Sequence, residues 1–314
     1  MCFISFGIIN SANLISLSLT QRAPEKMENN PFDSLMPPAM AHKAEEVGVY
    51  KATKHPLQSF FLAITAGVFI SIAFVFYTTV TTGAGSMPWG MAKFVGALAF
   101  SLGLILVVIC GGELFTSSVL TTVARASNRI TTGQLLRNWV VVYIGNFIGA
   151  SFFVVCIWIA KQHLGDNGQW GITAMKIAQH KLHHTFGQAV VLGMLCNLMV
   201  CLATWMTFSC RSATDKIMVM LLPVAMFVAC GFEHSIANMF MIPMGIVIHN
   251  FASPEFWAMT GVNPSQFADL TVNHFVMNNL IPVTIGNIIG GGFLVGLTYW
   301  VIHRRPELKG NSHH

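Results

Sequence analysis

The sequence predicts an all-α polytopic membrane protein with six transmembrane helices, arranged as two inverted three-helix repeats with broken second and fifth helices. Three observations lead to this fold class. Of the 314 residues, 54% are hydrophobic and only 9% are charged, and a core of that apolarity needs lipid as its solvent. Six apolar segments follow one another, and two of them are too long for one straight crossing. Each of these two is interrupted by the same Cys-Gly-x-Glu pattern.

The interruptions are paired motifs within one chain. Cys110 to Glu113 and Cys230 to Glu233 are 120 residues apart. An Ile-Gly-Asn-x-Ile-Gly motif also occurs twice, beginning at Ile144 and at Ile285, with a longer offset. We interpret the matches as an internal repeat with an insertion in its second copy. A repeated charged break in hydrophobic sequence is typical of transport proteins.

The chain begins with two segments that precede the apolar spans. Residues 1–26 lack the positive n-region of a signal peptide, and we expect an unstructured extension there. Residues 27–56 mix charged and apolar residues at helical spacing, which predicts a cytoplasmic amphipathic helix from Pro38 to about Lys51 at the membrane interface. We place the six-helix channel domain at 57–303 and a cytoplasmic tail at 304–314.

The apolar segments are long enough to cross a bilayer, which needs about 20 residues per helix. They cover residues 57–80, 94–124, 138–160, 187–209, 217–250 and 275–302. In the second and fifth, glycines beside a glutamate should end one helix and allow another to begin. Irregular backbone at that depth is tolerated only where protein or a water-filled cavity satisfies it. Each break should therefore face an internal path.

Orientation follows from the positive charges of the connections. Thirteen Lys and Arg residues fall in the N-terminal tail, the 125–137 loop, the 210–216 loop and the C-terminal tail, against four in the other connections. Both termini are therefore expected in the cytoplasm. Three spans per repeat is an odd number, so the second copy must enter from the opposite face. Small residues recurring four apart predict tight helix packing within one protomer, with oligomer contact as the alternative.

The candidate functional residues lie at the breaks. Glu113 and Glu233 are the only acidic residues outside termini and loops, and we expect each carboxylate to hold its break together by accepting hydrogen bonds from unwound backbone. His234 is the best functional candidate, because it stands beside only one of them and can titrate near neutrality. Thr116 either offers a hydroxyl to a substrate or caps a helix. Asn197 is a plausible partner of His234.

Other chemistries find little support in the sequence. The five Cys residues in apolar runs have no metal-site spacing, and the histidines of residues 180–184 lie in a predicted outer loop without a ligand pattern. We expect no metal, no cofactor and no catalytic residue, because hydrolase and phosphate-loop motifs are absent. The basic residues form no stripe for nucleic acid.

Several motifs, taken together, resemble the formate–nitrite transporter family from about Asn30 to Arg305. They are Lys51-Ala52-Thr53-Lys54-His55-Pro56, Gly112-Glu113-Leu114-Phe115-Thr116-Ser117, Asn197-Leu198-Met199-Val200 and Gly231-Phe232-Glu233-His234-Ser235-Ile236-Ala237-Asn238. A formate-conducting member often has Asp where Glu113 stands, which keeps the carboxylate.

The resemblance implies an aquaporin-like homopentamer in the bacterial inner membrane with one pore per protomer. By matched position, Phe100 and Phe227 should form an outer constriction. The inner constriction should consist of Leu104, Leu114, Phe115 and Val200. His234, Thr116 and Asn197 should lie between the two, while Lys181 outside and Lys51 inside should gather anions.

The expected function is passive or proton-coupled transport of formate and related small anions of weak acids, with His234 protonating or stabilising the anion. A nitrite or hydrosulfide channel of the same family fits the same framework. An aquaporin-type channel for neutral solutes is disfavoured because no Asn-Pro-Ala triplet occurs. The segment before the first span could also associate with a cytoplasmic formate-metabolising enzyme.

Overall fold

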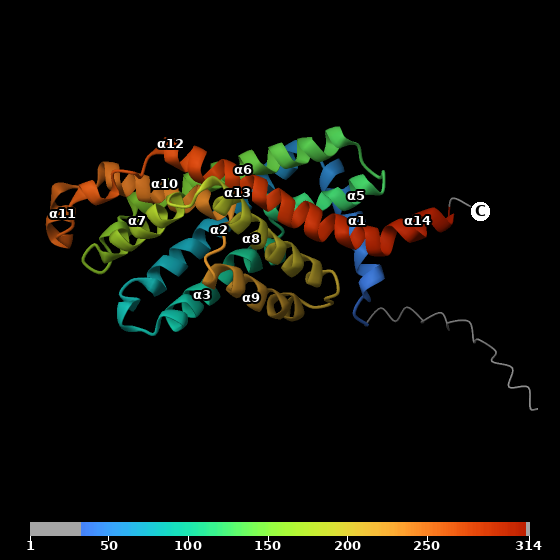
Figure 1. The fold of residues 1–314 in the computed structure, drawn as a ribbon, viewed down its shortest axis with the longest axis horizontal. Helices are drawn as coiled ribbons and strands as arrows, with labels where there is room; N and C mark the ends of the chain where they lie inside the picture. Colours follow the sequence, from blue (N-terminus) through green and yellow to red (C-terminus); the bar gives the residue numbers. More distant parts are fainter. Residues whose placement is uncertain (1–32, 312–314) are drawn as a thin grey trace, which may run out of the picture. The chain divides into compact units, whose positions relative to one another are not determined.

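The computed structural model describes residues 33–311, so the predicted extension over residues 1–26 lies outside the described residues. The described part is built from helices joined by short connections (Figure 1). The principal helices are α1 (Pro37–Thr53), α2 (Pro56–Thr81), α3 (Trp89–Cys110), α4 (Phe115–Ser118), α5 (Thr122–Ala126), α6 (Thr132–Ile159), α7 (Gln169–Leu182), α8 (Phe186–Thr207), α9 (Ala213–Ala229), α10 (Ser235–Phe251), α11 (Pro254–Thr260), α12 (Val272–His274), α13 (Ile281–Ile288) and α14 (Arg305–Asn311). Three π-helical stretches connect the last helices, at Phe275–Leu280, Ile289–Leu297 and Trp300–Arg304.

Five helices of the described part are long and apolar enough to cross a membrane, and up to six if one bent pair counts as a span. The five are Pro56–Thr81, Trp89–Cys110, Thr132–Ile159, Phe186–Thr207 and Pro264–Lys309, and the bent pair is Ser235–Phe251 with Pro254–Thr260. The predicted first, third and fourth spans match α2, α6 and α8 closely. The predicted second and fifth segments are broken as expected, at the ends of α3 and α9.

The helices of the two halves pack in the same order. In the first half α2 contacts both α6 and α3, and in the second half α8 contacts both α13 and α9. The halves also meet where α3 packs against α9 (Figure 1). Gly149 and Gly290 allow the closest approaches, because a Cβ there would lie 2.1 Å and 2.0 Å from carbonyl oxygens of Ile64 and Met194. These glycines therefore serve helix packing within the protomer, as the small-residue spacing predicts.

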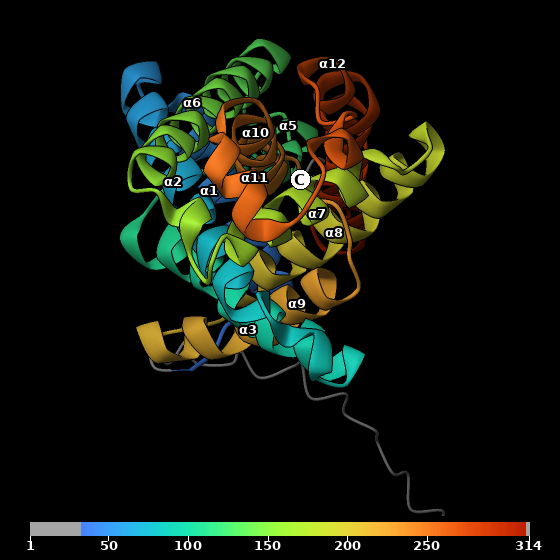
Figure 2. The ribbon, with the colours of Figure 1, turned by 90° about the vertical axis from the view of Figure 1, so that its left-hand side faces the viewer.

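One connection contains a helix that the sequence analysis assigns to a loop. Residues 169–182 form α7, which packs against α10 and buries Trp170 and Met175. The outer-loop assignment of residues 180–184 was therefore wrong for its first residues, since His180 and Lys181 belong to the last turn of α7. A helix that buries one face but carries polar residues on the other is too polar to stand out as a span. Figure 2 shows α11 in front of α10, after a bend of 105° between them.

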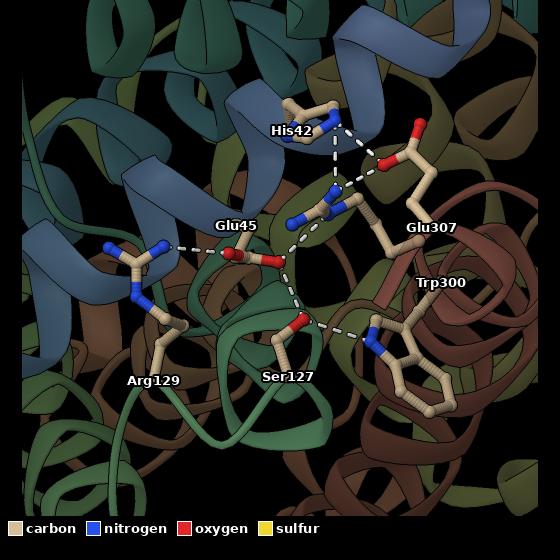
Figure 3. A network of polar contacts seen from close by, with 7 residues as sticks. His42, Glu45, Ser127, Arg129, Trp300 and Glu307 are labelled. Carbon is tan, nitrogen blue, oxygen red and sulfur yellow. Dashed lines mark hydrogen bonds and ion pairs between the residues drawn. The ribbon is translucent and has the colours of Figure 1, made fainter. Parts of the chain in front are cut away.

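The structure has a helix, α1, where the sequence predicts one before the first span, and α1 packs against α5 and the C-terminal helical region. Its place at the membrane interface stays a prediction. Glu45 is 2% exposed and accepts hydrogen bonds from Ser127 at 2.5 Å and from Arg129 and Arg304 at 2.9 Å each. Burial alone would raise the pKa of Glu45, but the bonds from Arg304 and Ser127 and the two guanidinium charges outweigh it and lower the pKa. The contacts around this carboxylate extend to His42, Trp300 and Glu307 (Figure 3). They tie α1 to the connection after α5 and to the C-terminal helical region.

Candidate functional site: the two helix breaks

Each break begins with a glycine in the left-handed region. Gly111 has φ of 87° and Gly231 has φ of 72°, values that cost other residues about 1–2 kcal/mol. The next N–H bends back to a carbonyl in the preceding helix, from Gly112 to Val107 and from Phe232 to Phe227. The glycines therefore end α3 and α9, as the sequence predicts, and the chain continues extended until α4 and α10 begin.

A buried asparagine closes the hydrogen bonds of each break. Asn146 accepts the N–H of Phe115 at 2.9 Å and donates to the carbonyls of Ala63 and Glu113 at 2.7 and 2.9 Å. Glu113 itself donates its N–H to Leu62. Unpaired backbone groups at this depth would cost several kcal/mol each. Asn146 therefore has a structural role, since it holds the first break together.

The second half repeats this arrangement bond for bond. Asn287 accepts the N–H of Ser235 at 2.9 Å and donates to the carbonyls of Gly193 and Glu233 at 2.8 and 3.0 Å. The N–H of Glu233 binds Leu192. The repeat seen in the sequence is thus a repeat of backbone geometry.

The carboxylate partners differ from the expectation. Glu113 pairs with Lys54 at 2.5 Å and Glu233 with Lys181 at 3.0 Å, and both carboxylates are 2% exposed as side chains. Among the described residues no backbone N–H donates to either carboxylate, because the asparagines and the neighbouring helices already satisfy the backbone of the breaks. The glutamates therefore hold the breaks through ion pairs.

The two ion pairs are not equally satisfied. The second oxygen of Glu233 accepts from Asn238 at 2.6 Å and from Asn279 at 3.1 Å. The second oxygen of Glu113 is buried and has no partner among the described residues. A desolvated carboxylate is stabilised only when charge and hydrogen bonds compensate. The second break is thus the better-satisfied of the two.

His234 is held between the two breaks. Its Nε2 lies 3.0 Å from the hydroxyl of Thr116, and its Nδ1 accepts the N–H of Ala237 at 3.0 Å. Because Nδ1 is an acceptor, the neutral ring carries its proton on Nε2 and donates it to Thr116. His234 is therefore both the N-cap of α10 and the donor that joins the second break to the first.

Of the two aromatic rings predicted to form the outer constriction, Phe227 contacts His234 and Phe100 packs against Phe227. Phe100 and Phe227 meet edge to face with centroids 6.2 Å apart, and Phe227 stacks on His234 at 6.1 Å. A cavity of about 240 Å³ is lined by all three and by Lys181 and Glu233. The pair His234–Thr116 thus lies beside an aromatic wall of this cavity; the constriction role of Phe100 and Phe227 stays a prediction.

The sequence and the structure of this chain match known proteins over most of its length. Residues 38–301 match the family described as Formate/nitrite transporter. The chain belongs to the formate/nitrite transporter family. It is 66% identical to the formate channel FocA of Escherichia coli, over 91% of this chain and 99% of the relative. It is 53% identical to the formate channel FocA of Haemophilus influenzae, over 86% of this chain and 96% of the relative.

Solved structures agree with these matches. A structure titled as a pentameric formate channel with formate bound has a TM-score of 0.76 at 62% identity, covering 79% of this chain and 97% of that one. A channel described as an FNT family ion channel, at 23% identity and a TM-score of 0.71, shares the fold. The fold is therefore that of a formate/nitrite transporter, and the family consists of transporters rather than enzymes.

Asn197 binds the backbone of Thr116 rather than His234 itself. Its amide donates to the carbonyls of Thr116 at 2.9 Å and Asn287 at 2.6 Å, and the thiol of Cys201 also contacts the Thr116 carbonyl at 3.2 Å. The predicted partnership of Asn197 with His234 is thus indirect. Asn197 fixes the backbone of the threonine that the imidazole contacts.

The inner constriction residues are all buried, but one of them turns away from the others. Leu104, Leu114 and Val200 are 4%, 0% and 2% exposed. The ring of Phe115 instead packs edge to face on Tyr143 and Trp139 of α6, with centroids 4.9 and 6.2 Å apart. The constriction role of these four residues stays a prediction.

The two predicted anion-gathering lysines differ in their partners. Lys181 is paired with Glu233, as described above, so its charge is largely neutralised. The ammonium of Lys51 lies 3.4 Å from the hydroxyls of both Ser117 and Ser118, at the start of α4. Burial lowers the pKa of Lys51, and the charge of Glu113 only partly opposes this. Lys54, which forms the ion pair with Glu113, was not among the site residues predicted from the sequence.

Proposed function

We propose that this family member moves formate and related small monovalent anions of weak acids across the bacterial inner membrane. The named relatives, 66% and 53% identical, support the substrate class. The observation that carries the mechanism is the His234–Thr116 hydrogen bond beside Phe100 and Phe227. It gives a small carboxylate the hydrogen of the Thr116 hydroxyl, whose oxygen accepts the Nε2–H of His234, beside two aromatic rings.

The energetics explain why such a polar pair is needed. A bare carboxylate between apolar rings costs several kcal/mol even after relaxation of the protein. Protonating a small carboxylate at pH 7 costs about 5 kcal/mol when the pKa of its acid is about 3.5, at 1.36 kcal/mol per pH unit. Crossing as the neutral acid is therefore competitive with crossing as the anion.

The geometry of His234 constrains how it takes part. Donating a proton outright requires Nδ1 to take up another, and Nδ1 is occupied by the N–H of Ala237. In this conformation the Nε2–H is donated to Thr116, so His234 stabilises the anion through the Thr116 hydroxyl, which keeps its own hydrogen to donate. Proton transfer requires the first turn of α10 to release the ring.

The finer elements of the proposal are assembly and orientation. We place both termini in the cytoplasm, on the positive-inside count, and propose a homopentamer because a solved relative is titled as one. A cytoplasmic formate-metabolising enzyme is proposed to bind the segment before the first span. Deleting residues 31–50, then measuring flux and enzyme association separately, tests that partnership.

The function is tested by flux into proteoliposomes across a pH series, with formate, nitrite and glycerol as solutes. Asparagine is the replacement of choice for His234, because it also caps helix N-termini and should keep α10 intact. We expect formate to exceed nitrite and glycerol, and His234→Asn to lose the pH response more than anion entry. Faster nitrite flux would favour the nitrite alternative. Equal glycerol flux would refute the anion assignment, and an unchanged pH response in the variant would refute a proton role for His234.

A further inference from the structure

The cavity beside His234 joins a polar, exposed lining to a buried aromatic one. Phe100, Phe227 and His234 line it and are 4%, 3% and 3% exposed. Lys176 and His180 of α7 line it as well, and both are exposed on the surface of the described part. The cavity therefore has a mouth at α7 that solvent reaches, and an aromatic wall that it does not reach.

Positive charge dominates this mouth. Three lysines line the cavity, Lys93, Lys176 and Lys181, against one carboxylate, Glu233. The carboxylate is paired with Lys181 at 3.0 Å. Lys93 and Lys176 form no ion pair within residues 33–311, and the ammonium of Lys93 lies 5.9 Å from the centroid of the Trp89 ring. Two ammonium groups are therefore available to an anion at the mouth.

Helical spacing and packing bring these groups together. Lys176 and His180 are four residues apart on α7, so they share one face of the helix. Lys93 belongs to α3, yet its charge reaches His180. Burial is the main cause that lowers the pKa of His180, and the charges of His184, Lys181 and Lys93 act in the same direction. At neutral pH the mouth thus offers two charged ammonium groups and one neutral imidazole.

We propose that this mouth binds a divalent oxyanion, such as sulfate or hydrogen phosphate, between Lys93 and Lys176, and that the bound dianion blocks the path. The inference rests on the proposed transport of small monovalent anions. Two unpaired ammonium groups match two negative charges, and charged donors form the stronger hydrogen bonds to oxyanions.

The aromatic wall opposes any further movement of such a dianion. In the idealised Born estimate the cost of desolvating an ion grows with the square of its charge. A dianion would therefore lose about four times as much as formate on leaving water for the wall of Phe100 and Phe227. The cavity would hold the dianion at its mouth and let a monovalent anion continue.

The test measures formate flux in proteoliposomes with sulfate on both sides, at an ionic strength held constant with sodium chloride. We expect sulfate to inhibit the wild type in competition with formate. Lys93→Gln and Lys176→Gln should each raise the inhibition constant of sulfate about ten-fold, the effect of one lost hydrogen bond to a charged group. The formate concentration for half-maximal flux should rise only about three-fold, because formate carries half the charge.

Matched variants separate charge at the mouth from charge in general. Lys93→Arg combined with Lys176→Arg keeps both charges and should keep the inhibition. Lys161→Gln removes another lysine of the same set of connections, which is exposed and does not line the cavity, and should leave the inhibition unchanged. An equal loss of inhibition in Lys161→Gln and in the two mouth variants would show general surface screening and overturn the proposal. Wild-type flux that sulfate does not inhibit would also overturn it.

Binding of radiolabelled sulfate to the purified protein gives a second measurement that does not depend on transport. We expect about one sulfate per protomer in the wild type, and none in the double variant Lys93→Gln with Lys176→Gln. A wild type that binds sulfate but carries no formate would refute the proposed function and leave the dianion site standing. A wild type that binds no sulfate would refute the site itself.

Discussion

The ion pair between Lys181 and Glu233 should be a measurable source of stability at the second break. Its atoms are 3.0 Å apart and the carboxylate is almost fully buried, so removing the lysine leaves a buried charge. Lys181→Met should therefore cost about 3–5 kcal/mol of unfolding free energy. At about 2–4 °C per kcal/mol for a chain of this size class, the melting temperature should fall by roughly 6–20 °C.

The double variant distinguishes the stability lost by breaking the ion pair from the stability lost by removing a side chain. Lys181→Met combined with Glu233→Gln removes both charges, and Gln keeps a carbonyl oxygen for Asn238 and Asn279. It should recover to within about 2 kcal/mol of the wild type, because a buried pair gains little over neutral residues. Thermal unfolding in one detergent, for the wild type, both single variants and the double variant, completes the cycle.

Lys176→Met is the matched control. Lys176 lies five residues earlier on α7 and lines the same cavity, but it is exposed and has no ion pair among the described residues. Its replacement should stay within about 0.5 kcal/mol of the wild type. A coupling energy below about 0.5 kcal/mol between Lys181 and Glu233 would refute the reasoning.

Three further predictions concern the backbone frame and α1. Asn287→Ala leaves the N–H of Ser235 and two carbonyls unpaired and should lower stability by about 2–5 kcal/mol, measured by the same melts; a loss under about 1 kcal/mol would contradict its role. Gly231→Ala should lower stability by only about 1–2 kcal/mol, because the added Cβ would meet nothing within 4 Å and only the positive φ disfavours alanine. Gly290→Ala should instead prevent α8 from packing on α13, because the added Cβ would lie 2.0 Å from the carbonyl oxygen of Met194. Expression and melting of the two glycine variants decide this, and equal effects would argue against it. Because the folded pKa of Glu45 is lowered, the stabilisation that this carboxylate gives to α1 is present above the unfolded pKa of about 4.3 and is lost as the pH falls through the folded pKa. Protection of α1 from protease should therefore drop in acid in the wild type. In Glu45→Gln the protection should already be weak at neutral pH.

The sequence predicted the fold class and the two breaks, and it pointed to His234 as a candidate, because each has a local signal. Glycine followed by glutamate inside an apolar run has few structural outcomes, and the structure confirms that α3 and α9 end there. Partners distant in sequence had no such signal. Lys54 is 59 positions from Glu113, and nothing local in the sequence indicates that it pairs with this carboxylate.

The direction of side chains was equally hidden. Whether Phe115 turns toward the other constriction residues or toward α6 depends on how α4 leaves the break, which Asn146 decides from 31 positions away. The role of His234 as a helix cap could have been found earlier, since it immediately precedes a helical run. We considered capping for Thr116, and the structure places it on the histidine.

The matched backbone of the two breaks separates the scaffold from its contents. In the repeat, Leu114 corresponds to His234 and Thr116 corresponds to Ile236. The asparagine and lysine contacts around these positions are nevertheless matched between the two halves. Both extended segments are held by contacts that the two halves share, namely the asparagine amides, the glutamate–lysine pairs and the backbone bonds to Leu62 and Leu192. A duplicated frame of this kind can therefore exchange its polar residues without refolding. New solute preferences within the family can arise by substitution at a few positions while the architecture stays constant.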